Sequence, residues 1–262
     1  MMKIPFSKYH GTGNDFILID NRQLQWKPRK EEIARLCDRH FGIGGDGLML
    51  LSEKSGFDFY MTYYNSDGME STMCGNGGRC MIIFARSLAI AGSETRFMAI
   101  DGEHLGKVTQ KDSSDIISLK MKDVRVDEID ADHLFLNTGS PHYVIFTQGV
   151  ETFDIITEAK KIRFNDRFRA EGTNVDFVEI RDDRLFVRSY ERGVEDETLS
   201  CGTGVTASAL AYAVKKPAHR TFMDVMTRGG TLRVLYHQEG NAFSDIWLEG
   251  PAVLVFQGEI VT

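Results

Sequence analysis

The stretch MCGNGGRC (73–80), which continues as MIIFARSLAIAG (81–92), decides how this chain is organised. It places a cysteine among glycines and then runs directly into an apolar segment. The pattern returns as ETLSCGTGVTASALAYAV (197–214), where cysteine, glycine, a small polar residue and glycine again precede an apolar run. The sequence therefore predicts the same structural device in two copies.

Other segments also match between the two parts of the chain. GTGNDFILI (11–19) resembles GTNVDFVEI (172–180), and a glutamate stands four residues before the cysteine in each part. Because the matches follow one order, we expect an old duplication and two pseudo-symmetric halves. The expected halves are residues 1–118 and 119–251, and a C-terminal strand at about 252–262 is expected to return to the first half.

The composition is that of an ordinary folded protein. Its 262 residues are enough for one large domain or two average ones. Hydrophobic residues make up 42% and charged residues 26%, as is usual for a globular protein. The net charge of -7 argues against a nucleic-acid partner, since such proteins usually carry a basic excess. No stretch has the ~18 apolar residues of a membrane span, and four cysteines are too few for a disulfide scaffold. We therefore expect a cytoplasmic protein with reduced thiols and no membrane partner.

Short apolar or alternating runs recur along the chain and predict β-strands. They are FILID (16–20), FDFYMTYY (57–64), IISLKM (116–121), HYVIF (142–146), VDFVEI (175–180), RLFVRSY (184–190), TLRVLY (231–236), DIWLEG (245–250) and VLVFQG (253–258). Apolar spacing predicts helices over 30–42, 79–91 and 203–214, the last stopped by Pro217. The last two are apolar nearly all round and belong inside the protein. The predicted fold is α/β (α+β), each half a mostly antiparallel sheet or barrel wrapped around a central buried helix.

Cys74 and Cys201 each stand where one of these buried helices is expected to begin. The first turn of a helix has unpaired N–H groups and a partial positive charge, so a thiol there ionises more easily. Glycines beside it let an anion such as a carboxylate approach the backbone closely. Cys37 and Cys80 lie on apolar helix faces, and we expect them to be core residues.

Two thiols that face each other suit one reaction especially well. One, as a thiolate, removes a proton from a carbon, and the other, as a thiol, returns a proton to the opposite face. This inverts a stereocentre without a cofactor, and the helix N-termini would take up charge that develops on a carboxylate. We expect no metal site, because Cys74 and Cys80 point about 120° apart on a helix and no histidine pair completes a site.

The chain resembles the diaminopimelate epimerases over nearly its whole length. The motifs that carry the resemblance are HGTGNDF (10–16), GIGGDGL (42–48), YNSDGMESTMCGNGGRC (64–80), TGSPHYV (138–144), GTNVDF (172–177) and YERGVEDETLSCGTG (190–204). These enzymes interconvert LL- and meso-diaminopimelate without pyridoxal phosphate. The resemblance implies two pseudo-symmetric α/β halves with the active site in the cleft between them. It also implies a small-molecule substrate, no cofactor and a homodimer.

The resemblance assigns roles to individual residues. Cys74 and Cys201 would be the two acid–base thiols. Backbone amides would hold the reacting α-carboxylate, namely those of Gly75, Asn76, Gly202 and Thr203.

The resemblance also assigns the remaining contacts with the substrate. Glu191 and Asn14 would lie near the reacting α-ammonium group. Arg192, with Asn65 and Asn174, would grip the distal end that does not react.

The resemblance also assigns a supporting role to one histidine. Two positions depart from the family pattern. His142 would sit beside the thiols and help to set their protonation. Ser140 stands where the family usually has asparagine, and Gly47 stands where some members carry glutamine. These departures concern recognition of the distal end rather than the reaction.

Three other functions use parts of the same pattern. A thiol–disulfide switch or oxidoreductase would join Cys74 to Cys201, but it needs no duplicated anion cradle. A proline-type racemase also uses two cysteines, but its substrate has no second charged end for Arg192 to bind. A non-enzymatic amino-acid binder requires no thiol on either side.

Overall fold

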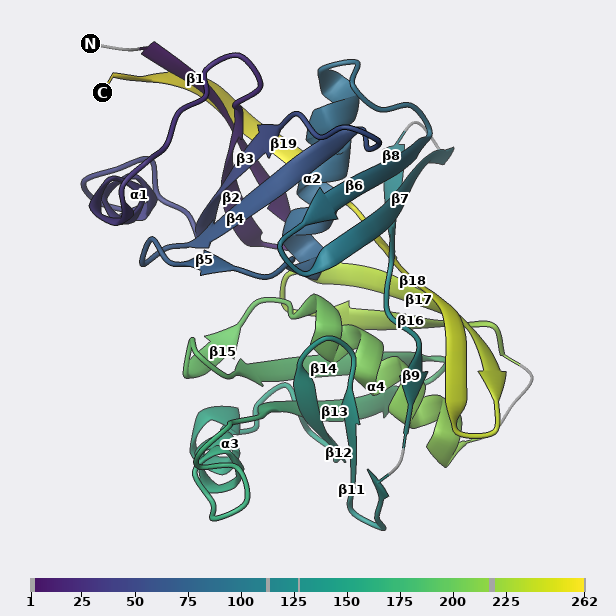
Figure 1. Cartoon of the computed structure of the whole chain (residues 1–262). Helices are drawn as coiled ribbons and strands as arrows, with labels where there is room; N and C mark the ends of the chain where they lie inside the picture. Colours follow the sequence, from purple (N-terminus) through teal and green to yellow (C-terminus); the bar gives the residue numbers. More distant parts are fainter. Residues whose placement is uncertain (1–2, 112–113, 127, 217–219, 262) are drawn as a thin grey trace. The chain divides into compact units, whose positions relative to one another are not determined.

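The structure is a computed structural model that describes residues 3–111, 114–126, 128–216 and 220–261 (Figure 1). The chain forms two compact units, each with its own strands and one long buried helix. Unit 1 comprises Met1–Leu119 and Gly250–Thr262, and unit 2 comprises Lys120–Glu249. The fold class expected from the sequence is confirmed. Pro217, the expected stop of the last helix, lies outside the described residues.

Unit 1 is built from antiparallel strand pairs joined by parallel ones. Its strands are β1 (Lys3–Gly11), β2 (Asn14–Asp20), β3 (Gly47–Ser52), β4 (Phe59–Asn65), β5 (Glu70–Ser71), β6 (Glu94–Ala99), β7 (Gly102–Lys111), most of β8 (Ser114–Lys120) and β19 (Val253–Val261). Its helices are α1 (Lys30–Cys37) and α2 (Gly75–Ser87). The C-terminal strand β19 pairs antiparallel with β1, so the two ends of the chain meet in one unit.

The helix α2 packs against β1, β2, β3 and β7 (Figure 1). Side chains from neighbouring elements crowd its first turn. A Cβ on Gly77 would lie 2.0 Å from Met49 Cε, and one on Gly78 would lie 3.0 Å from Met73 Sδ. The predicted span 79–91 is therefore wrong at its start, because the glycines form the first helical turn. It is also too long at its end, where Ala89 turns the chain away with a left-handed φ of 54°.

Unit 2 contains the second buried helix. Its strands are β9 (Val124–Arg125), β10 (Glu128–Ile129), β11 (His133–Asn137), β12 (Pro141–Phe146), β13 (Asn174–Arg181), β14 (Arg184–Glu191), β15 (Asp196–Thr198), β16 (Phe222–Thr227), β17 (Gly230–Glu239) and most of β18 (Ala242–Gly250). Its helices are α3 (Ile155–Arg163) and α4 (Gly202–Lys215). The helix α3 was not predicted, because only Ile155 and Ala159 are buried and its apolar pattern is correspondingly weak.

The order and pairing of the elements repeat between the units. In unit 1, β2 pairs parallel with β3 across α1, and β4 pairs parallel with β6 across α2. In unit 2, β12 pairs parallel with β13 across α3, and β14 pairs parallel with β16 across α4. The antiparallel pairs β3–β4 and β13–β14 also correspond. The predicted duplication is thus a property of the fold.

One of the matches used to predict this duplication is wrong. Segment 11–19 runs into β2, whereas segment 172–180 runs into β13, and β13 corresponds to β3. The element order instead aligns TGN (12–14) before β2 with TGS (138–140) before β12. Both segments place a glycine at a left-handed φ, 87° at Gly13 and 115° at Gly139.

One more helix end differs from its prediction. The first predicted helix, 30–42, ends early at Cys37, because Asp38 Oδ1 accepts the amides of His40 and Phe41 at 2.7 Å each and starts a turn. In the described part of the chain, no helix combines the length and apolarity needed to cross a membrane.

Candidate active site

Cys74 and Cys201 occupy the same position in the two units. Cys74 is the N-cap of α2 with φ -97°, and Cys201 is the N-cap of α4 with φ -107°. The first helical hydrogen bonds run from Gly78 N–H to Cys74 O at 2.7 Å and from Val205 N–H to Cys201 O at 2.8 Å. The backbone N–H groups of the three residues after each cysteine therefore precede the first helical bond and point out of the helix beside the thiol. Each thiol lies at the positive end of a buried helix.

In unit 1, the Asn14 side chain connects the thiol to a carboxylate, and a second asparagine contacts it. Cys74 Sγ lies 3.6 Å from Asn14 Oδ1, which also accepts from Asn76 Nδ2 at 3.3 Å. Asn14 Nδ2 donates to Asp46 Oδ2 at 2.6 Å. Thr12 Oγ1 donates to Asn76 Oδ1 at 3.4 Å. These contacts orient both amides, and the thiol faces an acceptor oxygen.

The carboxylates of this network are themselves paired with cations. Asp15 receives both arms of the Arg39 guanidinium, at 2.7 and 3.0 Å, and lies 2.8 Å from Lys8 Nζ. Arg39 also donates to Asp46 Oδ1 at 2.8 Å. Burial alone would raise the pKa of Asp15, but the hydrogen bonds from Arg39 and Lys8 outweigh it and hold that pKa well below the usual range.

Asn65 lies at the end of β4, opposite Gly47 of β3. Its backbone N–H donates to Met69 O at 2.9 Å and closes the turn into β5. Glycine at position 47, which departs from the expected family pattern, has a steric reason, because a Cβ there would lie 2.5 Å from Tyr64 O. Asn65 belongs to unit 1, whereas the other predicted distal-end residues belong to unit 2.

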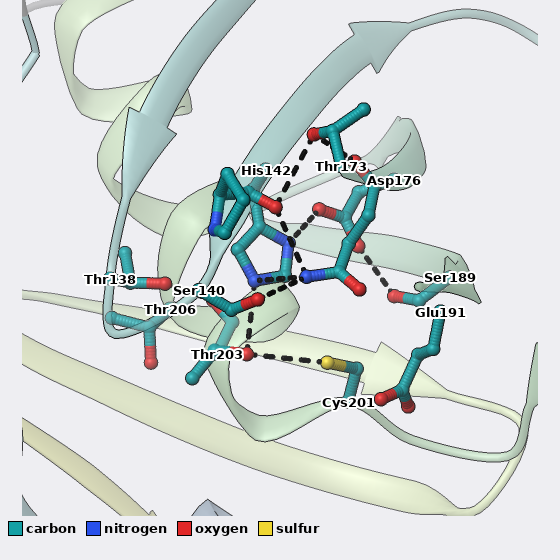
Figure 2. Close-up of polar contacts among 12 residues, drawn as sticks. Thr138, Ser140, His142, Thr173, Asp176, Ser189, Glu191, Cys201, Thr203 and Thr206 are labelled. Carbon is teal, nitrogen blue, oxygen red and sulfur yellow. Dashed lines mark hydrogen bonds and ion pairs between the residues drawn. The ribbon is translucent and has the colours of Figure 1, made fainter. Parts of the chain in front are cut away.

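In unit 2, a chain of polar contacts leads from the thiol to a buried carboxylate (Figure 2). Cys201 Sγ lies 3.4 Å from Thr203 Oγ1, which lies 2.9 Å from His142 Nε2. His142 Nδ1 lies 2.7 Å from Asp176 Oδ2, and Ser189 Oγ donates to Asp176 Oδ1 at 2.6 Å. His142 thus reaches the thiol through the Thr203 hydroxyl.

The neighbours of His142 assign its tautomer. The Asp176 carboxylate accepts, so a neutral His142 carries its proton on Nδ1 and offers Nε2 as an acceptor. The Thr203 hydroxyl then donates to Nε2, and its oxygen is left to accept from the thiol of Cys201.

The Cys201 thiol and the neighbouring Glu191 carboxyl group both have shifted pKa values. Burial raises the pKa of the Cys201 thiol well above its usual value, and the negative charges of Glu191 and Asp176 raise it further. Burial also raises the pKa of Glu191, although the Thr198 hydroxyl donates to its carboxylate and partly opposes the shift. Figure 2 shows the Glu191 carboxylate beside Cys201. Both groups are therefore biased towards their neutral forms.

Ser140, Asn174 and Arg192 form one cluster in unit 2. Asn174 Nδ2 donates to Ser140 Oγ at 2.8 Å, and its Oδ1 accepts the Arg192 backbone N–H at 2.9 Å. The Arg192 guanidinium donates to Glu171 O at 2.8 Å and to Ser140 Oγ at 3.4 Å. The departure at Ser140 therefore falls on a residue that touches both predicted distal-end groups.

A metal ion has one candidate set of ligands in the described part of the chain. Ligand atoms of Glu128, Asp130 and His133 lie within 4.8 Å of one another. Arg167 already donates to both oxygens of Glu128 at 2.6 Å each, so a cation would have to displace it. This set includes no residue of the two thiol networks.

Apart from Glu191 and Arg192, the charged residues near the thiols were not predicted from the sequence, and two of them could have been found, Arg79 and Asp176. Arg79 is fully buried within α2, and Asp176 is fully buried on β13. Each had a signal in the sequence: Arg79 directly precedes the apolar run 80–85, and Asp176 stands between Val175 and Phe177. A charge in a buried segment marks a paired or functional group.

Comparison with known proteins gives one consistent result. The family model described as "Diaminopimelate epimerase" matches residues 6–125 and 134–255. A "Diaminopimelate epimerase" of Flavobacterium psychrophilum is 49% identical over 97% of this chain and 98% of that protein. Another of the same name, from Chlorobaculum tepidum, is 41% identical over 95% of this chain and 98% of that protein.

Solved structures of low sequence identity share the fold. A phenazine biosynthesis protein of the PhzF family from Bacillus anthracis aligns over all of both chains with a TM-score of 0.75 at 15% identity. A probable proline racemase from Agrobacterium radiobacter aligns over 98% of this chain and 93% of its own with a TM-score of 0.71 at 14% identity. At this level of identity the likeness concerns architecture alone.

Proposed function

The chain belongs to the diaminopimelate epimerase family, and from this membership we propose that it interconverts LL- and meso-2,6-diaminopimelate with Cys74 and Cys201 as the two acid–base thiols. It is an isomerase, and its reaction serves the biosynthesis of lysine and of peptidoglycan precursors. One thiolate removes the α-proton and the other thiol protonates the opposite face of the same carbon.

The observation that carries this proposal is the equivalent placement of the two cysteines. Each is the N-cap of a buried helix in a duplicated unit, and each is followed by glycine, a polar residue and glycine. A carboxylate bound by the first-turn amides would share the partial positive charge of the helix. Charge that develops on the substrate as its α-proton leaves would be stabilised by the same amides.

The side chains around each thiol suit the remaining groups of an amino acid. The Asn14 oxygen and the Glu191 carboxylate are acceptors beside Cys74 and Cys201 respectively, and an α-ammonium group needs acceptors. At the distal end, Arg192 offers a planar guanidinium that can bind a carboxylate through two hydrogen bonds. Asn65 and Asn174 would complete that contact, and His142 would set the proton of Cys201 through Thr203.

The test follows deuterium during turnover. The reduced protein is incubated with LL-diaminopimelate in heavy water, without pyridoxal phosphate or metal, and early samples are analysed by NMR. The new meso product should carry deuterium at the inverted centre, while unreacted LL substrate stays largely protonated. Substantial proton retention in the product, or a requirement for pyridoxal phosphate, contradicts the proposal.

A redox role for the two cysteines makes a different prediction. A thiol–disulfide enzyme would need a Cys74–Cys201 bond during its cycle, whereas an epimerase loses activity when that bond forms. Mild oxidation followed by peptide mapping, with activity measured before and after addition of reductant, separates the two. Activity that persists after complete oxidation of both thiols excludes the epimerase mechanism.

We also expect a cytoplasmic homodimer. Four consecutive apolar residues of β19, Val253 to Phe256, are each between 44% and 54% exposed, and no charged residue interrupts them. A second copy presents the same uncharged stretch and can meet it about a two-fold axis. Light scattering should give twice the mass of one chain, and Val255→Lys should reduce it to one. Ile100→Lys, a change at an exposed apolar residue elsewhere, should leave the dimer intact.

A further inference from the structure

The two buried helices differ at one equivalent position in a way that distinguishes the two thiols. Arg79 follows Cys74 by five residues, and Thr206 follows Cys201 by five residues. Arg79 Nη1 donates to Gly75 O at 3.2 Å, and Thr206 Oγ1 donates to Gly202 O at 2.9 Å. Both side chains therefore reach the carbonyl next to the cysteine, but only Arg79 brings a positive charge.

Arg79 is buried without a carboxylate partner in the part of the chain that the structure describes. It is 0% exposed, and its guanidinium donates to neutral oxygens, Gly75 O and Asn76 Oδ1, the latter at 2.9 Å. Its Nε has no hydrogen-bond partner among the described residues. Burial lowers the pKa of Arg79 to about 10, so the side chain remains a cation at neutral pH. A buried charge of this kind costs several kcal/mol unless an anion compensates it.

The carboxylates near the start of α2 already have other partners. Asp15 and Asp46 are bound by Arg39, and Asp15 also by Lys8. Asp101, whose Oδ1 accepts the Met73 amide at 3.4 Å, lies 3.2 Å from His104 Nε2.

The remaining titratable groups on the elements around α2 do not supply the anion. Glu70 of β5 is exposed to solvent, Asp20 of β2 is paired with Arg22, and Glu103 of β7 is paired with Arg96. Cys80 is neutral, because burial raises its pKa to about 12, and Tyr9 of β1 is neutral because burial raises its pKa as well. The anion that compensates Arg79 must therefore form at the N-terminus of α2, where Cys74 and the substrate carboxylate would be.

We propose that Arg79 is a positioning residue that makes the two thiols unequal, so that Cys74 ionises first and Cys201 keeps its proton. The thiol of Cys74 donates to Asn14 Oδ1 across 3.6 Å, a weak hydrogen bond that opposes ionisation little. Around Cys201 the nearby titratable groups are the acids Glu191 and Asp176, whose ionised forms oppose a thiolate. The free protein then holds Cys74 as the base and Cys201 as the acid.

This inference rests on the proposed function for its meaning, but its test needs no substrate. The reduced protein is treated with iodoacetamide over a range of pH, and alkylation of Cys74 and Cys201 is quantified separately by peptide mass spectrometry. In the wild-type protein, the midpoint for Cys74 should lie at least about one pH unit below that for Cys201. Equal midpoints, or the reverse order, overturn the inference, whereas failure of the proposed function would appear only in the deuterium assay.

Variants at Arg79 separate its charge from its packing. Arg79→Gln keeps a donor for Gly75 O but removes the charge, and it should raise the Cys74 midpoint by about one unit or more without moving that of Cys201. Arg79→Lys keeps the charge and should restore most of the difference. Arg86→Gln, an exposed change on the same helix, should leave both midpoints unchanged. An unmoved Cys74 midpoint in folded Arg79→Gln contradicts the role. If that variant does not fold, the wild-type order and the Arg79→Lys profile decide.

Discussion

His142 Nδ1 lies 2.7 Å from Asp176 Oδ2, and both side chains are fully buried. The two residues come from neighbouring parallel strands, β12 and β13, in which His142 is in register with Asn174. Asp176 lies two residues further along β13 and so on the same face of the sheet. The pair orients the acceptor nitrogen of the histidine towards the Thr203 hydroxyl, which in turn contacts the Cys201 thiol.

Asp176→Asn should impair the reaction more than the fold. An asparagine can donate to His142 Nδ1 as well as accept from it, so the tautomer is no longer fixed. We expect kcat to fall about 100-fold, the lower end of what general acid–base catalysis contributes. Steady-state kinetics with LL-diaminopimelate measure this loss. Asp183→Asn, at a surface ion pair with Arg220, should behave as wild type.

Cys74→Ala and Cys201→Ala should each abolish inversion. Each variant lacks either the acid or the base for a given direction, and a reversible reaction needs both. The assay is the appearance of meso product from LL-diaminopimelate. Cys37→Ala is the matched control, because Cys37 packs in a different core cluster of unit 1, with Ile33 and Leu36. Near-normal inversion by either of the first two variants would rule out the pair of thiols.

Arg192→Lys should weaken substrate binding. Lysine provides one point charge and cannot reproduce two parallel hydrogen bonds to a carboxylate. It would also lose the contacts of the guanidinium with Glu171 O and Ser140 Oγ. We expect KM for diaminopimelate to rise about 10- to 100-fold, which corresponds to roughly 1.4–2.8 kcal/mol. Arg169→Lys, at an exposed ion pair with Asp166, should leave KM unchanged.

Glu191→Gln should change how stability depends on pH. Because burial raises the pKa of Glu191 in the folded state, the native protein binds this proton more tightly than the unfolded chain does. The stabilisation is complete below the unfolded pKa of about 4.3 and is lost as pH rises through the folded value. Relative to Glu191→Gln, the wild type should therefore lose free energy of unfolding as pH rises from 4 towards 7. Denaturant titrations at several pH values give the difference, and Glu31→Gln, at an exposed site on α1, should show no such trend.

Gly204→Ala should damage the site in unit 2. A Cβ on Gly204 would lie 2.4 Å from Asp176 Oδ1 and 3.0 Å from Ser189 Oγ, so the buried carboxylate or α4 must move. We expect a loss of about 1–3 kcal/mol in the free energy of unfolding, together with lower activity. Gly92→Ala, where nothing lies within 4 Å of the added carbon, should be neutral in both measurements. Equal effects of the two substitutions would show that packing against Asp176 does not matter.

The sequence by itself determined the duplicated device and the chemistry at its centre. A cysteine followed by glycines and an apolar run is enough to place a thiol at the start of a buried helix, because helix termini and apolar periodicity are local properties. All nine predicted strands are present in the structure for the same reason, as the alternation in FDFYMTYY (57–64) illustrates, with Phe59, Met61 and Tyr63 buried. Local signals were less reliable for boundaries: α2 begins at Gly75, and its first turn contains glycines because Met49 and Met73 leave no room there for side chains.

Only the tertiary structure decided which residues surround the thiols. Asp176 reaches His142 because two strands far apart in sequence pair in parallel, and no local pattern determines that register. The true partner of segment 12–14 proved to be segment 138–140, which emerged from the order of strands rather than from similarity of letters. The burial of Arg79 likewise depends on the sheet that encloses α2, and desolvation by that sheet turns an ordinary arginine into an uncompensated charge beside Cys74.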